Sequence, residues 1–253
     1  MCGKIITIAN QKGGVGKTTT AINLSSAIAM NNKKVLVVDF DPQGNCSSGF
    51  GIKKDKDTIY EVIMGKIDIQ SAIVSTKVDN CFLIPANINL TGAGVELVDR
   101  EDREFYLKNA LTKIKGKYDY IFIDCPPSLG LLTVNGLAAA DTVLIPLQTE
   151  FFALEGLSQL VNTINLIKKS FNPELQIEGV LLTMLDKRTH LTDDVAKNVI
   201  AYFGKKVYKT MIPRNVRIAE APSYGIPVML HDKNCIGSKA YESLALEFIN
   251  GKD

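Results

Sequence analysis

The stretch NQKGGVGKTTT, residues 10–20, decides how this chain folds. The run KIITIA (4–9) before it is rich in β-branched residues and predicts a buried strand, while the residues after it have the apolar spacing of an amphipathic helix. Gly13, Gly14 and Gly16 allow the backbone between them to curl, so that successive N–H groups point inward beside the positive end of the helix dipole. A strand, a glycine-rich turn and a helix in this order predict a phosphate-binding loop.

Two lysines of the loop have different predicted tasks. Lys17 is placed to reach the terminal phosphates of a nucleotide, and the hydroxyl of Thr18 is placed to ligate Mg²⁺. Lys12 is an additional cation, and Gln11 stands where the common form of this loop has a glycine. The residues alone leave Lys12 open to two interpretations: a surface lysine beside a turn, or a second cation for the phosphates.

Strand-like and helix-like segments alternate along the rest of the chain. The strand-like runs are apolar on both faces, which is typical of parallel strands covered by helices on two sides. They are KIITIA (4–9), KVLVVDF (34–40), YIFIDC (120–125), TVLIPL (142–147), IEGVLLTML (177–185) and VYKTMIP (207–213). Residues 154–167 have a helical apolar period, whereas 43–100 is the least regular stretch. We predict an α/β fold with one doubly wound, mostly parallel sheet flanked by helices, forming a single domain over residues 1–253.

Carboxylates follow two of the predicted strands. Asp124 ends YIFID, and Asp39 and Asp41 end KVLVVDFD. Ligands of open parallel sheets gather at the carboxyl ends of the strands, so we expect Asp124 to hold Mg²⁺ through water. One residue of the 39/41 pair would orient the metal or the attacking water. Taken alone, each aspartate could also be a helix cap or a turn residue.

Composition limits the classes of function. The 253 residues include 29 basic and 27 acidic side chains, so any nucleic-acid-binding surface must be local. No apolar run approaches the ~20 residues of a membrane span, and no signal peptide is visible, which favours a soluble cytoplasmic protein. The five cysteines have no C-x-x-C spacing, which argues against a zinc site or a disulfide framework. They are Cys2, Cys46, Cys81, Cys125 and Cys235.

Several motifs together resemble one family. KGGVGKTTTAINL (12–24), VVDFDPQGN (37–45), IDCPPSLG (123–130), MLDKRTHL (184–191) and IPRNVRIAEAPSYG (212–225) are similar to the ParA/Soj family of chromosome- and plasmid-partitioning ATPases. The similarity covers essentially the whole chain. The loop alone would indicate only the wider group of P-loop NTPases with a deviant Walker A motif. The DFDPQGN and PRNVR-x-x-EAPS-x-G segments narrow it to Soj-like partition proteins.

The resemblance implies ATP and Mg²⁺ as cofactors and assigns roles to residues. The residue that matches Lys12 enters the partner subunit of an ATP-bound homodimer, where a cation delivered on assembly would stabilise the charge of the transition state. Gly13 would be small because two loops approach each other there. Lys12, Lys17 and Asp41 would be catalytic, and Thr18, Asp41 and Asp124 would hold the metal. The nucleotide-binding set would be Lys12, Gly13, Gly14, Val15, Gly16, Lys17, Thr18, Thr19, Pro213 and Asn215, with Pro213 and Asn215 at the adenine.

The same resemblance implies macromolecular partners. Residues 187–239 contain ten lysines and arginines against four acidic residues. Arg188 matches a position that relatives use for non-specific binding of double-stranded DNA, and Arg217 lies in the matching PRNVR segment. We therefore expect an ATP-dependent, nucleoid-associated DNA-binding dimer that is released by a ParB-type protein and does not bind a membrane.

Three other functions remain as alternatives. A MinD-like membrane switch would need a basic amphipathic C-terminal helix, but YESLALEFINGKD (241–253) has only Lys252 as a cation. An iron–sulfur ATPase would need suitably spaced cysteines, and Cys125 is instead interpreted as a small core residue. A small-molecule synthetase on the same fold is the third. No segment before the first strand is long enough for a helix-turn-helix domain, which favours the short, Soj-like type.

Overall fold

The computed structural model describes residues 3–53, 55–150, 153–186 and 190–251. Within these residues seven strands form one sheet in the order β3-β4-β2-β5-β1-β6-β7. All neighbouring strands are parallel except β3 and β4, which are antiparallel. The strands are β1 (Lys4–Ile8), β2 (Val35–Asp39), β3 (Val74–Ser75), β4 (Cys81–Ile84), β5 (Tyr120–Asp124), β6 (Thr142–Gln148) and β7 (Gln176–Thr183). The predicted doubly wound α/β fold is confirmed.

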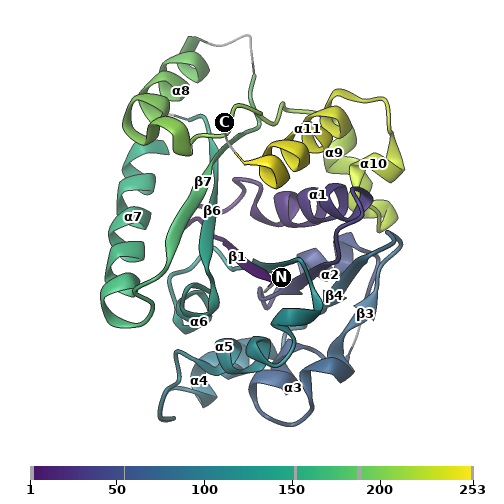
Figure 1. The fold of residues 1–253 in the computed structure, drawn as a ribbon, viewed down its shortest axis with the longest axis vertical. Helices are drawn as coiled ribbons and strands as arrows, with labels where there is room; N and C mark the ends of the chain where they lie inside the picture. The colour runs from purple at the N-terminus through teal and green to yellow at the C-terminus, as the bar shows by residue number, and fades with distance from the viewer. Residues whose placement is uncertain (1–2, 54, 151–152, 187–189, 252–253) are drawn as a thin grey trace.

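Helices cover both faces of this sheet (Figure 1). One face carries α3 (Ile59–Ile63), α4 (Leu90–Glu96), α5 (Tyr106–Thr112), α6 (Leu131–Ala139), α7 (Ala153–Ser170) and α8 (His190–Phe203). The other carries α1 (Lys17–Met30), α2 (Asn45–Gly49), α9 (Val216–Glu220), α10 (Val228–His231) and α11 (Ile236–Asn250). A 3₁₀ turn, η4 (Ala221–Tyr224), joins α9 to the segment before α10. Among the described helices, none has both the length and the apolar character required to cross a bilayer.

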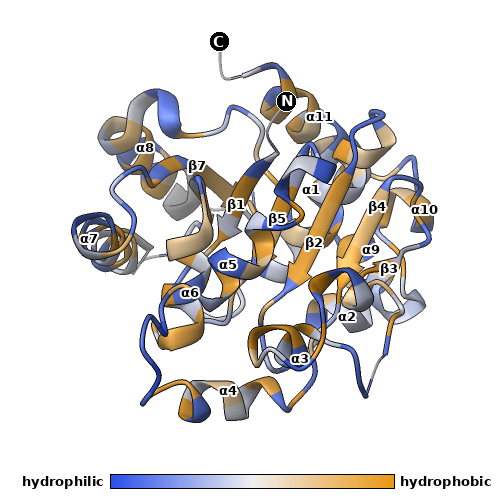
Figure 2. Ribbon diagram, turned by 60° about the horizontal axis from the view of Figure 1, so that its bottom comes forward, coloured by the Kyte–Doolittle hydropathy of each residue, from blue (hydrophilic) through white to orange (hydrophobic). Residues whose placement is uncertain are grey.

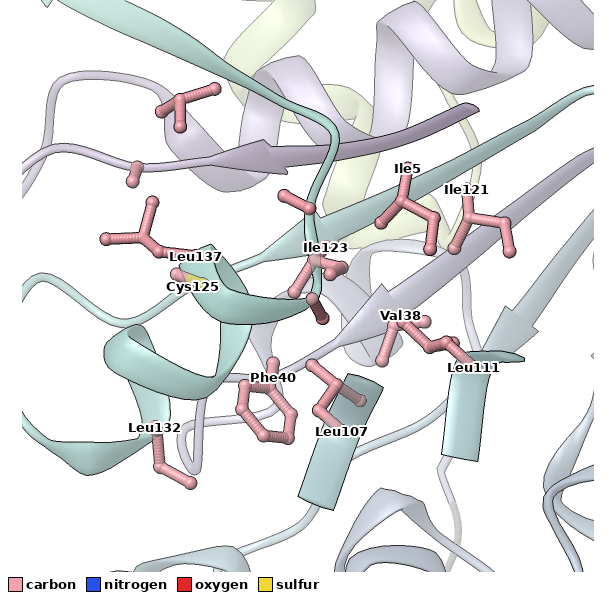
Figure 3. Packing of buried hydrophobic residues seen from close by; sticks show 14 of the residues in the cluster. Ile5, Val38, Phe40, Leu107, Leu111, Ile121, Ile123, Cys125, Leu132 and Leu137 are labelled. Atoms are coloured by element: carbon pink, nitrogen blue, oxygen red, sulfur yellow. The ribbon is translucent and has the colours of Figure 1, made fainter. Parts of the chain in front are cut away.

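The strands feed two separate core layers, because successive side chains point to opposite faces. Ile5 packs with the layer under α3–α8, whereas Ile6 and Ile8 pack with the layer under α1 and α11. Figure 2 shows the central strands as almost continuously apolar. Figure 3 shows Cys125 in the first layer beside Ile123 and Leu137, and its side chain is buried as predicted.

The helix after the glycine-rich turn differs from its prediction. Rather than having one polar face, α1 is buried from Thr20 to Ala29, including Asn23, Ser25 and Ser26. The helix lies between the sheet and α11, so both of its sides are covered. Two of these polar side chains bond to the backbone of their own helix, since the Ser25 hydroxyl donates to Ile22 and the Asn23 amide donates to Thr19.

Two strands of the sheet were not predicted, and one predicted strand does not form. The irregular stretch 43–100 contains β3 and β4, which the sequence did not reveal because both are short. The strand predicted over VYKTMIP (207–213) is wrong: this segment runs parallel to β7 but makes only isolated bridges, Val180 with Val207 and Leu185 with Pro213. Between the bridges, the backbone N–H groups of Lys209 and Thr210 donate to the carboxylate of Glu247 on α11.

Candidate active site

The glycine-rich turn leaves the sheet where its winding reverses. From β1 the chain passes through α1 to β2 on one side, and from β5 it passes through α6 to β6 on the other. Such a reversal opens a crevice at the carboxyl ends of the two central strands. Gly14 and Gly16 have positive φ angles of 75° and 89°, so the turn uses conformations that glycine adopts without strain. Gly16 then caps α1.

Lys17 points back across the turn. Its Nζ donates to the backbone carbonyl of Lys12 at 3.1 Å, and its side chain is buried. Burial lowers the pKa of the ammonium, and the nearby carboxylates of Asp124 and Asp41 oppose that shift. A buried cation beside two carboxylates, at the start of a helix, is well placed to receive phosphate oxygens.

Asp124 has the environment expected of a metal ligand. It is completely buried at the end of β5, and neither of its carboxylate oxygens makes a hydrogen bond of normal geometry. Burial, followed by the nearby charge of Asp39, raises its pKa well above the usual value, while the Thr18 hydroxyl is close enough to counteract this. An unpaired buried carboxylate is costly unless a cation compensates it.

The donor set around Asp124 fits Mg²⁺, which prefers oxygen ligands and uses few carboxylates together with water and phosphate oxygens. Among the described residues, no group of three or more His, Cys, Asp or Glu side chains is arranged to hold an ion by itself. Thr18, Asp41 and Asp124 would share the ion with a nucleotide. When bound, the ion would neutralise charge on the phosphates.

The structure separates the two aspartates at the end of β2. Asp39 is fully buried and accepts hydrogen bonds from the N–H and hydroxyl of Ser47, at 2.8 and 2.6 Å, and from the N–H of Asp41. Asp41 instead lines the cavity in front of the turn. Of the pair, Asp41 faces the place where a nucleotide would react, and Asp39 holds the segment that carries it.

Two cavities adjoin the turn. The loop cavity has a volume of about 630 Å³ and lies in front of Lys17 and Thr18; its polar lining includes Asp41, Gln43, Asn45, Ser48 and Ser223. The Pro213 cavity has a volume of about 300 Å³. It is lined by Gly16, Thr19, Thr183, Met184, Ile212, Pro213, Arg214, Asn215, Ile218, Ala219 and Tyr241. Since the two cavities share Gly16, Thr19 and Met184, one extended ligand can occupy both.

Pro213 and Asn215 therefore lie together beside the turn, as the sequence suggested. The side-chain oxygen of Asn215 accepts hydrogen bonds from the backbone N–H groups of Arg217 and Ile218 and so caps α9. The cap uses the oxygen and leaves the amide nitrogen as the group that can face a ligand.

Val15 is buried, and its carbonyl accepts a hydrogen bond from the Thr183 hydroxyl at 2.9 Å.

Lys12 lies on the outer side of the turn. Its side chain lines neither cavity and forms an ion pair with Glu150, and both side chains are about half exposed. Gly13 faces open space: a Cβ built there would have no atom within 4 Å. Of the predicted nucleotide-binding residues, Lys12 and the buried Val15 are the two that line neither cavity, and only Lys12 of these two is exposed.

Of the two candidate DNA-binding arginines, the structure describes only Arg217. Arg188 lies outside the described residues. Arg217 is exposed on α9, but its guanidinium is paired with Glu220 at 2.9 Å and with Asp232 at 3.5 Å. These two carboxylates compete with any phosphate for the same cation.

Sequence reasoning missed several residues of the site. Glu150 pairs with a lysine 138 positions away, which no local pattern indicates. Thr183 and Met184 line the cavities from the carboxyl end of β7, and their place at the end of a predicted strand was a usable signal. Asn45 and Ser223 lie in the DFDPQGN and EAPSYG segments that carry the resemblance but were assigned no role, and Ser48 lies in the short polar helix that begins at Asn45.

The fold and this site define a P-loop ATPase that uses ATP and Mg²⁺. Residues 3–177 match the AAA domain family. The chain is 54% identical over 247 residues to the chromosome-partitioning ATPase Soj of Treponema pallidum, covering 98% of this chain and 97% of that protein. The chain belongs to the AAA domain family and, within it, to the ParA/Soj partitioning ATPases.

Solved structures agree with the fold and the ligand class. A plasmid partition protein of Borrelia burgdorferi bound to AMPPNP has a TM-score of 0.83 and 31% identity, with 98% of each chain covered. A cobyrinic acid a,c-diamide synthase of Mycobacterium smegmatis with an ATP analogue and magnesium has a TM-score of 0.88 and 37% identity, with 98% of this chain and 94% of that one covered. ATP hydrolysis to ADP and phosphate is the activity of this chain.

Proposed function

We propose that this ATPase is a DNA-partitioning switch. Two ATP-bound copies face each other across their phosphate loops, and the homodimer binds double-stranded DNA without regard to sequence. A ParB-type DNA-binding protein then stimulates hydrolysis and releases the dimer, so the protein acts in the cytoplasm on the nucleoid. The relatives named as chromosome- and plasmid-partitioning proteins support this proposal.

One observation carries the dimer: the outer side of the phosphate loop is open. Lys12 lies outside its own cavities, and Gly13 has free space where a side chain would be. A second copy can therefore approach closely there and receive Lys12 at its phosphates. In this arrangement Lys12, Lys17 and Asp41 are the catalytic residues, because two cations stabilise the phosphoryl charge and Asp41 orients the attacking water.

The proposed DNA binding is supported by a local excess of basic residues. Residues 187–239 are strongly basic in a chain whose net charge is only +2. Contacts from lysine and arginine to phosphates would be independent of sequence and sensitive to salt. Since Arg217 is already paired with two carboxylates, Arg188 is the better single candidate for a phosphate contact. Dimerisation would double the contacts on one surface, which makes binding depend on ATP.

The experiment combines assembly and DNA binding. Asp41→Ala should retain ATP in a stable dimer, seen by size-exclusion chromatography with light scattering. That dimer should bind an arbitrary duplex at low salt, bind it poorly at high salt, and bind it poorly with ADP. A monomeric Asp41→Ala protein loaded with ATP would refute the face-to-face dimer. Equal DNA binding with both nucleotides, or unchanged binding by Arg188→Glu, would refute the DNA-binding role.

A synthase activity is the second candidate, favoured by the similarity to the Mycobacterium smegmatis protein. The two functions differ in what stimulates ATP turnover. Partitioning predicts stimulation by duplex DNA together with a ParB-type protein, and no change with cobyrinic acid. A large increase in ATP consumption with cobyrinic acid alone would favour the synthase instead.

A further inference from the structure

The segment 207–214 is attached to β7 in an irregular register. Tyr208 N–H donates to Val180 at 3.0 Å, and the next bond of this kind goes from Ile212 N–H to Leu182 at 2.9 Å. The ladder thus advances four residues on one side and two on the other. In a regular parallel ladder both sides advance equally, so the segment contains two extra residues between these two bonds. From the bridge at Val207 to the bridge at Pro213 the net excess is one residue, because the segment advances six residues while β7 advances five.

The excess is held by a single side chain of α11. The N–H groups of Lys209 and Thr210 donate to the two carboxylate oxygens of Glu247, at 2.7 and 2.9 Å. Two hydrogen bonds to one ionised carboxylate are stronger than bonds between neutral groups. Glu247 therefore satisfies two adjacent N–H groups, of which a regular parallel ladder would direct only one, that of Thr210, toward β7.

Tyr208 and Ile212 anchor the segment at two points, because both are buried in the core layer that contains α11, but the residues between them lie at a groove. A groove of about 850 Å³ separates residues 209–214 from the first half of α11, and we call it the α11 groove. It is lined by Leu185, Asp186, Lys209, Thr210, Met211, Pro213, Arg214, Ile236, Lys239, Ala240 and Ser243. Glu247, one turn beyond this groove, spans from the helix to the segment directly.

The held segment continues into the Pro213 cavity. Ile212, Pro213, Arg214 and Asn215 line that cavity, and they begin two residues after Thr210. If this net excess of one residue were drawn back into the ladder, the residues after it would move along β7 by about 3 Å, and their side chains would change faces. Such a slip would remove Pro213 from the cavity beside the phosphate loop.

We propose that Glu247 is a positioning residue for the nucleobase: it fixes the register of residues 207–214 and thereby keeps the Pro213 cavity in shape. This inference rests on the proposed placement of the base between Pro213 and Asn215. Glu247 does not contact the nucleotide and acts on the base end only. The phosphate end is held by the glycine-rich turn and α1, which have no bond to Glu247.

The test compares two ligands on the full-length chain with Mg²⁺, by isothermal titration calorimetry. ADP uses both ends of the site, whereas tripolyphosphate uses the phosphate end alone. Glu247→Ala should weaken ADP binding about tenfold, equal to about 1.4 kcal/mol, and change tripolyphosphate binding less than about twofold. Glu247→Gln, which keeps one acceptor oxygen, should give an intermediate loss for ADP.

Two further variants distinguish a wrong role for Glu247 from a wrong placement of the base. Glu242→Ala removes a carboxylate of the same helix that lines neither the Pro213 cavity nor the α11 groove, and should bind both ligands normally. Ala219→Trp fills the Pro213 cavity and tests the base assignment itself. If Ala219→Trp binds ADP normally, the placement of the base is wrong. If Ala219→Trp loses ADP and Glu247→Ala does not, only the role of Glu247 is refuted.

A second measurement covers a variant that binds poorly because it folds poorly. Amide hydrogen exchange should become faster at Lys209 and Thr210 in Glu247→Ala, while the amides of α1 stay protected. Equal losses for ADP and tripolyphosphate, or unchanged exchange at residues 209 and 210, would contradict the proposal.

Discussion

Asp39 and Asp124 lie opposite each other on the last shared pair of β2 and β5, and both carboxyl groups are fully buried. Burial raises the pKa of Asp39 from 3.8 to about 6, and its hydrogen bonds with Ser47 only partly oppose that shift. Burial of two neighbouring carboxyl groups disfavours their ionisation, and a bound cation would oppose that effect.

A dependence of stability on pH follows. Because folding raises the pKa of Asp39, the folded chain binds this proton more tightly than the unfolded chain between about pH 4 and 6. The free energy of unfolding should therefore fall as pH rises through this window, by up to about 3 kcal/mol from Asp39 alone. Urea unfolding of Asp39→Asn should show a flatter dependence than the native chain; identical slopes would contradict it.

Substitution of the two lysines of the loop should have different effects on ATP binding. Lys17→Ala removes the buried ammonium in front of Asp124 and should abolish ATP binding, because no other cation lines the loop cavity among the described residues. Lys12→Ala removes an exposed ammonium paired with Glu150 and should leave ATP binding by the monomer within about threefold. Calorimetry on both variants is the measurement. A Lys17→Ala protein that binds ATP normally would overturn the site assignment.

Gly13 tests the open side of the loop. A side chain at this position meets no atom within 4 Å, and the residue is not among the glycines with positive φ, so Gly13→Val should fold normally and bind nucleotide. The branched side chain should nevertheless prevent the ATP-dependent dimer. Gly116→Val is the matched control, since Gly116 also has no atom within 4 Å and lies in another part of the chain. Light scattering with ATP would show a dimer for Gly116→Val and a monomer for Gly13→Val.

Gly225 tests the close approach between the residue after η4 and the turn after α2. A Cβ on Gly225 would lie 2.5 Å from the Cα of Gly51, and both glycines have positive φ. Gly225→Ala should lower the free energy of unfolding by about 2–4 kcal/mol, from steric overlap and backbone strain together. Gly65→Ala has a positive φ but open space, so it isolates the strain and should lose only about 1 kcal/mol. Equal losses in the two variants, measured by urea unfolding, would show that the close approach is unimportant.

Local patterns were sufficient for much of the fold and the phosphate end of the site. Buried parallel strands are apolar throughout, and the turn between β1 and α1 needs glycines at fixed positions, so both are visible in the sequence. Asp124 and Asp41 were found because strand ends converge on one edge of a sheet.

Long-range contacts account for what the sequence could not show. Residues 207–213 have the composition of a strand, but Glu247 on α11 takes two of their N–H groups. Nothing near Lys12 indicates that it pairs with Glu150. The residue pattern alone left Asp39 and Asp41 equivalent, and the resemblance favoured Asp41; in the structure, Asp39 accepts hydrogen bonds from Ser47 while Asp41 lines the loop cavity.

The enclosure of α1 has a mechanical consequence. A helix covered by the sheet on one side and by α11 on the other cannot tilt or slide without breaking two packed interfaces. The phosphates of a bound nucleotide would thus contact the start of a helix that keeps its position. A movement that distinguishes ATP from ADP would therefore involve the other walls of the two cavities, which are α2 and the segment from Pro213 to η4.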